Sequence, residues 1–68
     1  MRFGKNLREL RLEKGLTQSQ LGKMVNVAGA TVRGWESYQR EPSYTILCKL
    51  AQIFNVTVGQ LLGSEDYG

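Results

Sequence analysis

The sequence predicts an all-α fold, a compact bundle of five short helices in one domain. Three observations support this prediction. Apolar residues recur three and four positions apart in several stretches, which gathers them on one face of a helix. Two T-x-x-Q boxes, at residues 17–20 and 57–60, are typical of helix starts, because the Thr caps backbone N–H groups while the Gln reaches back. A chain of 68 residues has the length of a single small domain.

The first helix is expected over residues 3–14. Phe3, Leu7 and Leu10 recur at helical spacing, and Lys14 continues the row with an aliphatic stem that can cover the edge of the apolar stripe. Gly15 follows the last periodic residue and is a typical helix stop.

The last two helices are expected after Pro42. Ser43 is the expected cap of a helix whose core stripe follows at helical spacing: Leu47, Leu50, Ala51 and Phe54. Asn55 is the expected stop, and Thr57 starts a short helix that ends with Leu61 and Leu62. We therefore expect a folded domain over residues 1–62 and a polar tail, or the start of a linker, over residues 63–68.

The stretch from Thr17 to Tyr38 predicts two helices joined by a tight turn. The first begins at the Thr17 cap, and its expected inner face is Leu21, Met24 and Val25. Asn26 is the expected end, since Asn tolerates the left-handed conformation of a turn. The second begins at Ala28, with an expected inner face of Ala28, Val32 and Trp35. This arrangement is a helix-turn-helix, whose second helix enters the DNA major groove.

One spacing within this stretch resembles that of the phage-repressor or Cro family of helix-turn-helix domains. It runs Gln18…Val25-Asn26-Val27…Thr31-Val32…Trp35-Glu36. The resemblance implies a transcriptional regulator, repressor-like, that binds a palindrome of double-stranded DNA as a dimer. It also implies an ion pair between Arg11 and Glu36. The helical spacing agrees with this ion pair. Glu36 lies beside Val32 and Trp35 on a helical wheel, so its carboxylate leans towards the core and needs a partner. The alternative is that Arg11 and Glu36 are two ordinary surface charges.

The outward face of the second helix is expected to be Gly29, Ala30, Arg33, Gly34 and Ser37. The resembling family places hydrogen-bonding side chains at four of these positions, and three of the four hold Gly or Ala here. Gly and Ala cannot make bidentate contacts to bases, although they allow close backbone approach and contact with a thymine methyl. Arg33 reads guanine or binds phosphate, and both alternatives stay open. The expected base-facing set is Gln18, Gly29, Ala30, Thr31, Arg33 and Gly34.

Charge is concentrated in the same half of the chain. Residues 1–40 contain eight Lys or Arg against three acids, whereas residues 41–68 contain one Lys against three acids. A basic half that coincides with a helix-turn-helix indicates phosphate binding, and the alternative is a solvated basic surface. The expected phosphate contacts are Thr17, Lys23, Ser37 and Arg40.

Two aromatic residues have competing interpretations. Trp35 lies at an inner helical position, which favours the core over stacking on bases. Tyr38 occupies the position where the resembling family commonly ends this helix with Gly. A positive φ is costly for Tyr, so the helix is expected to run slightly longer.

Several functions are not expected from this sequence. There is no apolar run long enough to span a membrane, and the first residues do not form a signal peptide, so a cytoplasmic location is expected. The single Cys48 is expected to be a buried free thiol, and without His no zinc site or other cofactor is expected. No Ser stands beside a residue that could act as its general base, and the sequence has no glycine-rich loop of the kind that binds nucleotide phosphates. Neither catalysis nor a small-molecule substrate is therefore expected.

Two further expectations concern partners. The featureless outer face of the second helix leaves an alternative, a protein-interaction module of the same fold, such as an antitoxin or antirepressor. A weak homodimer, at least on DNA, is expected through apolar residues near the C-terminus, because so small a domain cannot bury them all. These residues are Ile46, Ile53, Val58, Leu61 and Leu62. The competing interpretation is that Leu61 and Leu62 merely close the core.

Overall fold

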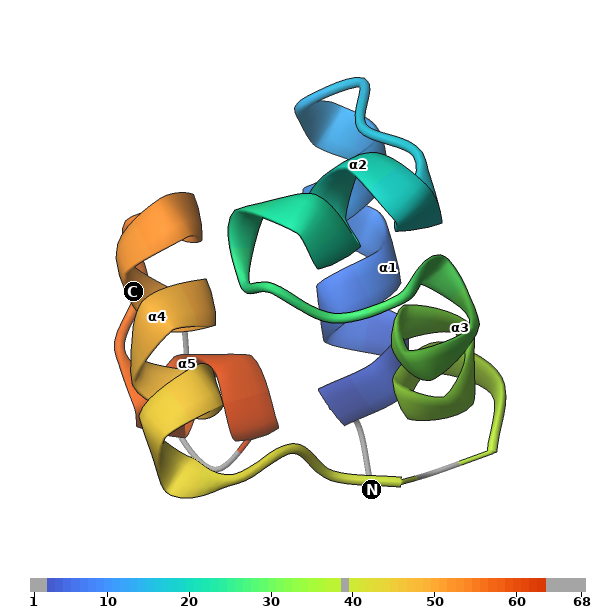
Figure 1. The fold of residues 1–68 in the computed structure, drawn as a ribbon. Coiled ribbons are helices and arrows are strands. Elements are labelled where there is room, and N and C mark those ends of the chain that lie inside the picture. The colour runs from blue at the N-terminus through green and yellow to red at the C-terminus, as the bar shows by residue number, and fades with distance from the viewer. Residues whose placement is uncertain (1–2, 39, 64–68) are drawn as a thin grey trace.

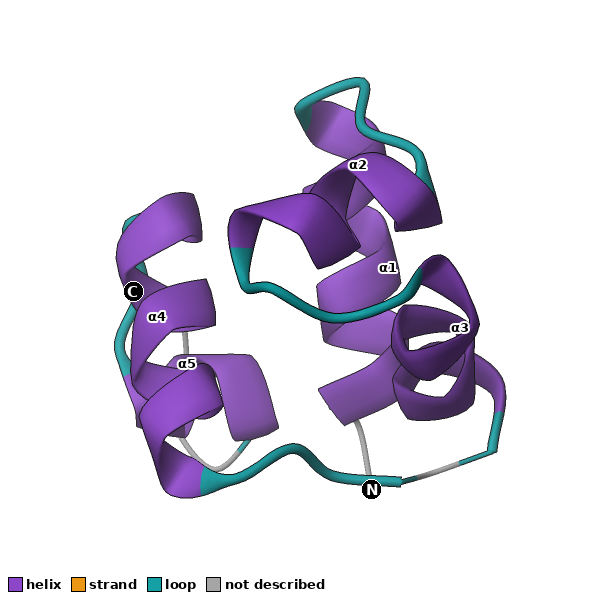
Figure 2. Ribbon diagram, in the orientation of Figure 1, coloured by secondary structure: helices purple, strands orange, loops and turns teal. Residues whose placement is uncertain are grey.

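The computed structural model describes residues 3–38 and 40–63, and the regular structure in these ranges is entirely helical (Figures 1 and 2). The five helices are α1 (Phe3–Glu13), α2 (Gln18–Met24), α3 (Gly29–Ser37), α4 (Tyr44–Phe54) and α5 (Val58–Leu62). The predicted all-α bundle is therefore confirmed. Residues 64–68, most of the expected tail, lie outside the described residues.

The helix α1 lies in the middle of the bundle. Figure 1 shows α2 crossing beside it and α3 packed against its other end, while α4 and α5 form a pair on the opposite side. The described residues before α4, 40–43, run along one edge of the molecule towards that helix (Figure 1). This arrangement leaves α2 and α3 adjacent, as a helix-turn-helix requires.

Local hydrogen bonds explain where the helices begin. The Thr17 hydroxyl accepts from the Gln20 backbone N–H at 3.0 Å, and the Gln20 side-chain Oε1 accepts from the Thr17 backbone N–H at 2.8 Å. The same reciprocal pair forms between Thr57 and Gln60, at 2.9 and 3.0 Å. The Ser43 hydroxyl starts α4 by accepting from a backbone N–H at 3.3 Å. Both predicted capping boxes and the predicted Ser cap are confirmed.

Left-handed residues end the segments where the sequence predicted stops. Asn26 and Asn55 have φ of 64° and 56°, and Gly15 has φ of 66°. Tyr38 does not need this conformation, because its φ is −116° and α3 ends at Ser37. The expected extension of α3 past this position does not occur.

The hydrophobic core draws on all five helices. Its buried members are Phe3, Leu7, Leu21, Val25, Val32, Trp35, Leu47, Leu50, Ala51, Phe54 and Leu61. Trp35 is thus a core residue, as its helical position predicted, and not an exposed stacking platform. Cys48 is half-buried rather than buried.

Two expected inner positions, Met24 and Ala28, were wrong, and α1 ends one residue before its expected end. Met24 is 52% exposed, and the buried neighbour of Leu21 is instead Gly22, which lies against the α2–α3 turn. A Cβ on Gly22 would stand 2.5 Å from the Val27 carbonyl oxygen, so only Gly fits this close approach. Ala28 is exposed because it caps α3 from outside the helix. Lys14 is also exposed, since α1 ends at Glu13.

The side chain of Asn6 joins the two ends of the chain. Its amide donates to the carbonyl oxygens of Gln60 and Leu61 in α5, at 3.3 and 3.2 Å. Carbonyls in the last turn of a helix lack the usual partner within the helix; the Gln60 carbonyl also accepts from the Gly63 N–H at 3.1 Å, and Asn6 adds a donor from α1 to both carbonyls. This contact holds α5 against α1, and the periodicity of the sequence gave no indication of it.

Candidate nucleic-acid interface

The helices α2 and α3 are in close contact at Gly29. A Cβ at this position would stand 2.6 Å from the Ser19 hydroxyl oxygen and 3.1 Å from the Ser19 Cα. The expectation that Gly29 lies on the open outward face is therefore wrong, because its Cα faces α2. A side chain there would push the two helices apart, so Gly29 sets the geometry of the helix-turn-helix.

The position of Gly34 also differs from the expectation. It is buried, because the chain after α3 folds back and lays the side chain of Arg40 over it. A Cβ on Gly34 would stand 3.6 Å from the Arg40 Cδ, and the Arg40 N–H donates to the Gly34 carbonyl oxygen at 3.4 Å. The backbone of Gly34 therefore helps to hold Arg40, which follows α3, against the helix.

The remaining expected base-facing residues of α3 are exposed. They are Ala30, Thr31 and Arg33, and they are followed by the exposed Ser37 at the helix end. Val32 and Trp35 are buried behind them, so the inner face of α3 is anchored in the core and the outer face is open. Such a helix can enter a DNA groove without exposing the core.

Arg11 and Glu36 are paired, and the pair is deeply buried. The Arg11 Nε donates to the Glu36 Oε2 at 2.7 Å and the Arg11 Nη2 to the Oε1 at 3.0 Å, with side chains only 9% and 2% exposed. The Arg11 Nη1 also donates to the Leu16 carbonyl oxygen at 2.8 Å. Hydrogen bonding to Glu36 raises the pKa of Arg11 above its ordinary value, despite the opposing effect of burial. The two residues are not ordinary surface charges.

Gln18 belongs to the same network, a role that the sequence did not predict. Its amide Nε2 donates to the Glu36 Oε1 at 3.2 Å. Gln18 is half-buried at the first position of α2, so the carboxylate of Glu36 joins α1, α2 and α3 at one point. Helical spacing within α2 could not reveal this contact, because its partner is 18 residues away in sequence.

The four residues expected to contact phosphate are all exposed. Thr17 and Lys23 lie at the two ends of α2, and Ser37 and Arg40 lie at the end of α3 and just after it. The Thr17 hydroxyl already accepts a hydrogen bond from Gln20, yet its own proton is available for donation. Lys23 and Arg40 are the two cations of this set, and the exposed Arg33 on α3 adds a third.

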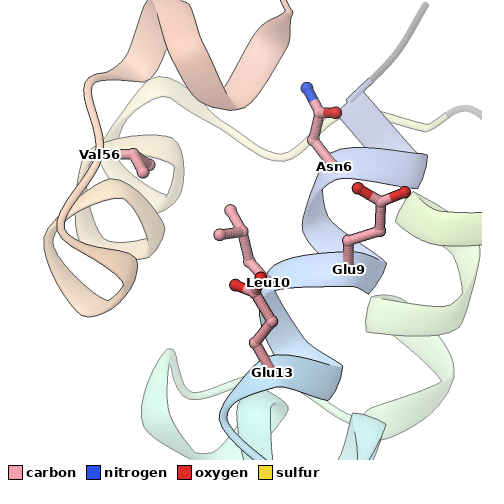
Figure 3. Close-up of a pocket in the computed structure, with 5 residues that line it drawn as sticks. All are labelled: Asn6, Glu9, Leu10, Glu13 and Val56. Atoms are coloured by element: carbon pink, nitrogen blue, oxygen red, sulfur yellow. The ribbon is translucent and has the colours of Figure 1, made fainter. Parts of the chain in front are cut away.

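A hollow in the surface lies away from α3, between α1 and the α4–α5 connection. It has a volume of about 320 Å³ and is lined by Asn6, Glu9, Leu10, Glu13 and Val56. Figure 3 shows four of these side chains on α1 and Val56 facing them from the α4–α5 connection. Two carboxylates would repel a phosphate backbone, so this surface is not part of a DNA interface.

Two features are absent from the described ranges, 3–38 and 40–63. No helix there is long and apolar enough to cross a membrane. No group of three or more Cys, Asp or Glu side chains there is arranged to hold a metal ion.

The fold and the exposed face of α3 define a small helix-turn-helix domain. Comparison with known families agrees: residues 7–61 match the family model described as helix-turn-helix, so the chain belongs to this family. The predicted resemblance to phage repressors is confirmed by structural similarity to the P22 c2 repressor, solved in complex with a synthetic operator. The TM-score is 0.84 at 28% identity, covering 93% of this chain and 96% of the repressor chain.

Curated relatives are named as transcriptional regulators. The HTH-type transcriptional activator BcrR of Enterococcus faecalis is 35% identical over 97% of this chain. The HTH-type transcriptional regulator ImmR of Bacillus subtilis is 32% identical over the same share. Both relatives are longer, since the aligned region spans 32% of BcrR and 52% of ImmR.

Proposed function

We propose that this chain binds double-stranded DNA in a sequence-specific manner and regulates transcription, with α3 in the major groove. The observation that carries the proposal is the α2–α3 unit, whose outer face is open while Val32 and Trp35 anchor its inner face in the core. The ion pair of Arg11 and Glu36 fixes this unit on α1. Similarity to a repressor solved on its operator supports the same mode of binding.

The contacts are divided between base reading and phosphate binding. Ala30, Thr31 and Arg33 face the base edges from α3, and Gln18 approaches from the start of α2. The phosphate contacts come from Thr17, Lys23, Ser37 and Arg40. Gly29 and Gly34 contribute through their backbone only, by allowing close packing of α2 and of Arg40. Specificity then depends on few side chains and on DNA shape.

The proposal includes a weak homodimer on DNA, formed at α5 and the adjacent end of α4. Leu61 is fully buried and closes the core, so it cannot belong to the contact. The half-buried Ile46, Ile53, Val58 and Leu62 remain from the expected set. A two-fold contact through these side chains would place two copies of α3 on half-sites about one helical turn apart.

The role assigned here is binding alone. The proposal includes no catalytic step, no cofactor and no small-molecule substrate, and it places the protein in the cytoplasm with the DNA that it binds. The alternative, an antitoxin-like or antirepressor-like interaction module, is not favoured, because the relatives are named as transcriptional regulators. Since those relatives are longer, any regulatory activity beyond DNA binding belongs to the proposal as well.

Selection of binding sites from random duplex DNA tests the proposed function. A recurrent palindromic motif is expected, and affinity for it should fall steeply as salt increases, because binding releases counterions. A parallel titration against candidate protein partners separates the two functions. Absence of binding to any duplex at low salt, together with capture of a protein, would favour the interaction module.

A further inference from the structure

The exposed acidic side chains of the basic half of the chain gather at one place. Residues 1–40 contain three acids, and one of them, Glu36, is buried in the ion pair with Arg11. The other two, Glu9 and Glu13, both line the hollow between α1 and the α4–α5 connection (Figure 3). This hollow therefore carries negative charge in a half of the chain that is otherwise positive.

Glu9 and Glu13 lie one helical turn apart and lack a partner of opposite charge. Both side chains are exposed. Within residues 3–38 and 40–63, no ion pair or hydrogen bond joins either carboxylate to another residue. Like charges at this spacing on a helix repel each other. Cations placed against both carboxylates would relieve this repulsion.

Two apolar side chains form facing walls of the hollow. Leu10 and Val56 are half-buried, and Figure 3 shows the Leu10 side chain pointing towards Val56. The volume of about 320 Å³ is near the lower limit for pockets that hold a whole small molecule, roughly 300 Å³. The hollow therefore suits one or two side chains of a larger partner, with an aliphatic group between the walls and cations beside the carboxylates.

We propose that this hollow docks a helical segment of another protein, in which an aliphatic residue is accompanied by two Lys or Arg one turn apart. In a two-fold pair of antiparallel helices, residue i of one helix faces residue j of the other, and j faces i. The spacing along α1 is Glu9-Leu10-x-x-Glu13. A partner helix with the same spacing, Lys-Leu-x-x-Lys, places a Lys opposite each Glu and its Leu beside Leu10.

Charge disfavours the other macromolecular occupants. A second copy packed on α1 in the same way would place Glu9 opposite Glu13, and a DNA phosphate would meet two carboxylates. A cationic segment of a different protein meets neither obstacle. This inference goes beyond the proposed DNA binding and does not depend on it, because the hollow is not part of that interface.

The probe for the first test is a synthetic Ala-rich peptide that carries one Lys-Leu-x-x-Lys segment. Its length is about 15 residues, at which such helices begin to form in water. Added to isotope-labelled protein, it should shift the backbone amide NMR signals of the residues that line the hollow: Asn6, Glu9, Leu10, Glu13 and Val56. A peptide with Glu in place of both Lys, and one with Ala in place of Leu, should each bind about tenfold more weakly.

The second test changes only the hollow. Glu9→Gln/Glu13→Gln should weaken peptide binding about tenfold, because two exposed ion pairs are lost, each contributing about threefold. Glu41→Gln removes an exposed carboxylate just before α4, outside the hollow, and is the matched control. It should bind the peptide as wild type does, and a circular dichroism melt confirms that both variants are folded.

Several outcomes would overturn this inference. They are the absence of shifts at the hollow, equal binding of the Lys and Glu peptides, and equal weakening by Glu41→Gln. Signals of the hollow that move on dilution of the free protein would assign the surface to a second copy. Binding of n-butylammonium as tight as that of the peptide would make the hollow a site for a small cation, and either result would also overturn it. None of these results bears on DNA binding, which site selection tests separately.

Discussion

The Arg11 guanidinium holds the Glu36 carboxylate by two hydrogen bonds, of 2.7 and 3.0 Å, and Glu36 in turn accepts from Gln18 at 3.2 Å. Three helices therefore meet at one buried carboxylate. This relationship couples the orientation of α3 to α1 and to the first residue of α2, so stability and DNA binding should respond together when it is broken.

Removing one partner of this pair should be strongly destabilising. Arg11→Met leaves a buried carboxylate without its cation, and the free energy of unfolding should fall by about 3–5 kcal/mol in urea denaturation. The double variant Arg11→Met/Glu36→Leu should lose less than Arg11→Met alone, because no charge is then left unpaired. A single-variant loss below about 1 kcal/mol would show that the pair does not brace the fold.

The contribution of Arg11 should not titrate near neutral pH. Hydrogen bonding to Glu36 raises the folded pKa of Arg11, so its stabilising effect is fully present below the ordinary Arg pKa and is lost only as pH rises through the folded value. The difference in unfolding free energy between wild type and Arg11→Met/Glu36→Leu, which carries neither charge, should therefore stay constant from about pH 7 to 10.

Two glycines of α3 should respond to the same substitution in opposite directions. Gly34→Ala should raise the melting temperature by roughly 4–8 °C, since Ala is about 1 kcal/mol more favourable in a helix and fits the available space. Gly29→Ala should lower the melting temperature, because its Cβ would overlap Ser19. Equal shifts in the same direction would contradict the proposed packing of α2 on α3.

Arg33 has two possible roles, and they differ in how the effect of Arg33→Ala depends on the DNA sequence. If Arg33 reads guanine, Arg33→Ala should weaken binding by about 1–3 kcal/mol and relax the preference at one position of the selected site. If it binds phosphate, the loss should be similar on all duplexes. Site selection with wild type and Arg33→Ala distinguishes the two cases, and identical affinities and logos would remove Arg33 from the interface.

Arg40 should act through phosphate. Arg40→Ala should reduce the slope of log affinity against log salt by about one unit on both specific and nonspecific duplexes, because one fewer counterion is released. Lys49→Ala carries the same charge change on α4 and should leave the slope unchanged. An effect of equal size in both variants would instead indicate a general electrostatic contribution.

Leu62 should contribute to dimerisation on DNA. It is half-buried, so Leu62→Lys adds charge to the proposed two-fold contact without opening the core that Leu61 closes. Cooperativity on a palindromic site should fall, while affinity for one half-site is retained. Sedimentation of the free protein over a wide concentration range checks for the dimer, and unchanged cooperativity together with a monomer throughout would exclude this contact.

The sequence by itself determined the helices and much of their assembly. Thr17 and Thr57 act on N–H groups two or three residues away, and Asn55 adopts its left-handed conformation for local reasons, so these features could be predicted without a structure. The periodic rows of apolar residues likewise placed Val32 and Trp35 in the core.

Tertiary structure decided which residues face outward. Met24, expected on the inner face of α2, is exposed, and Gly22 is buried instead, because the space beside the α2–α3 turn has no room for a side chain. Gly34, expected on the outward face, is buried because the Arg40 side chain lies against it. A helical wheel gives the direction of a side chain from its own helix, whereas exposure depends on which other segments approach it, and those segments are distant in sequence.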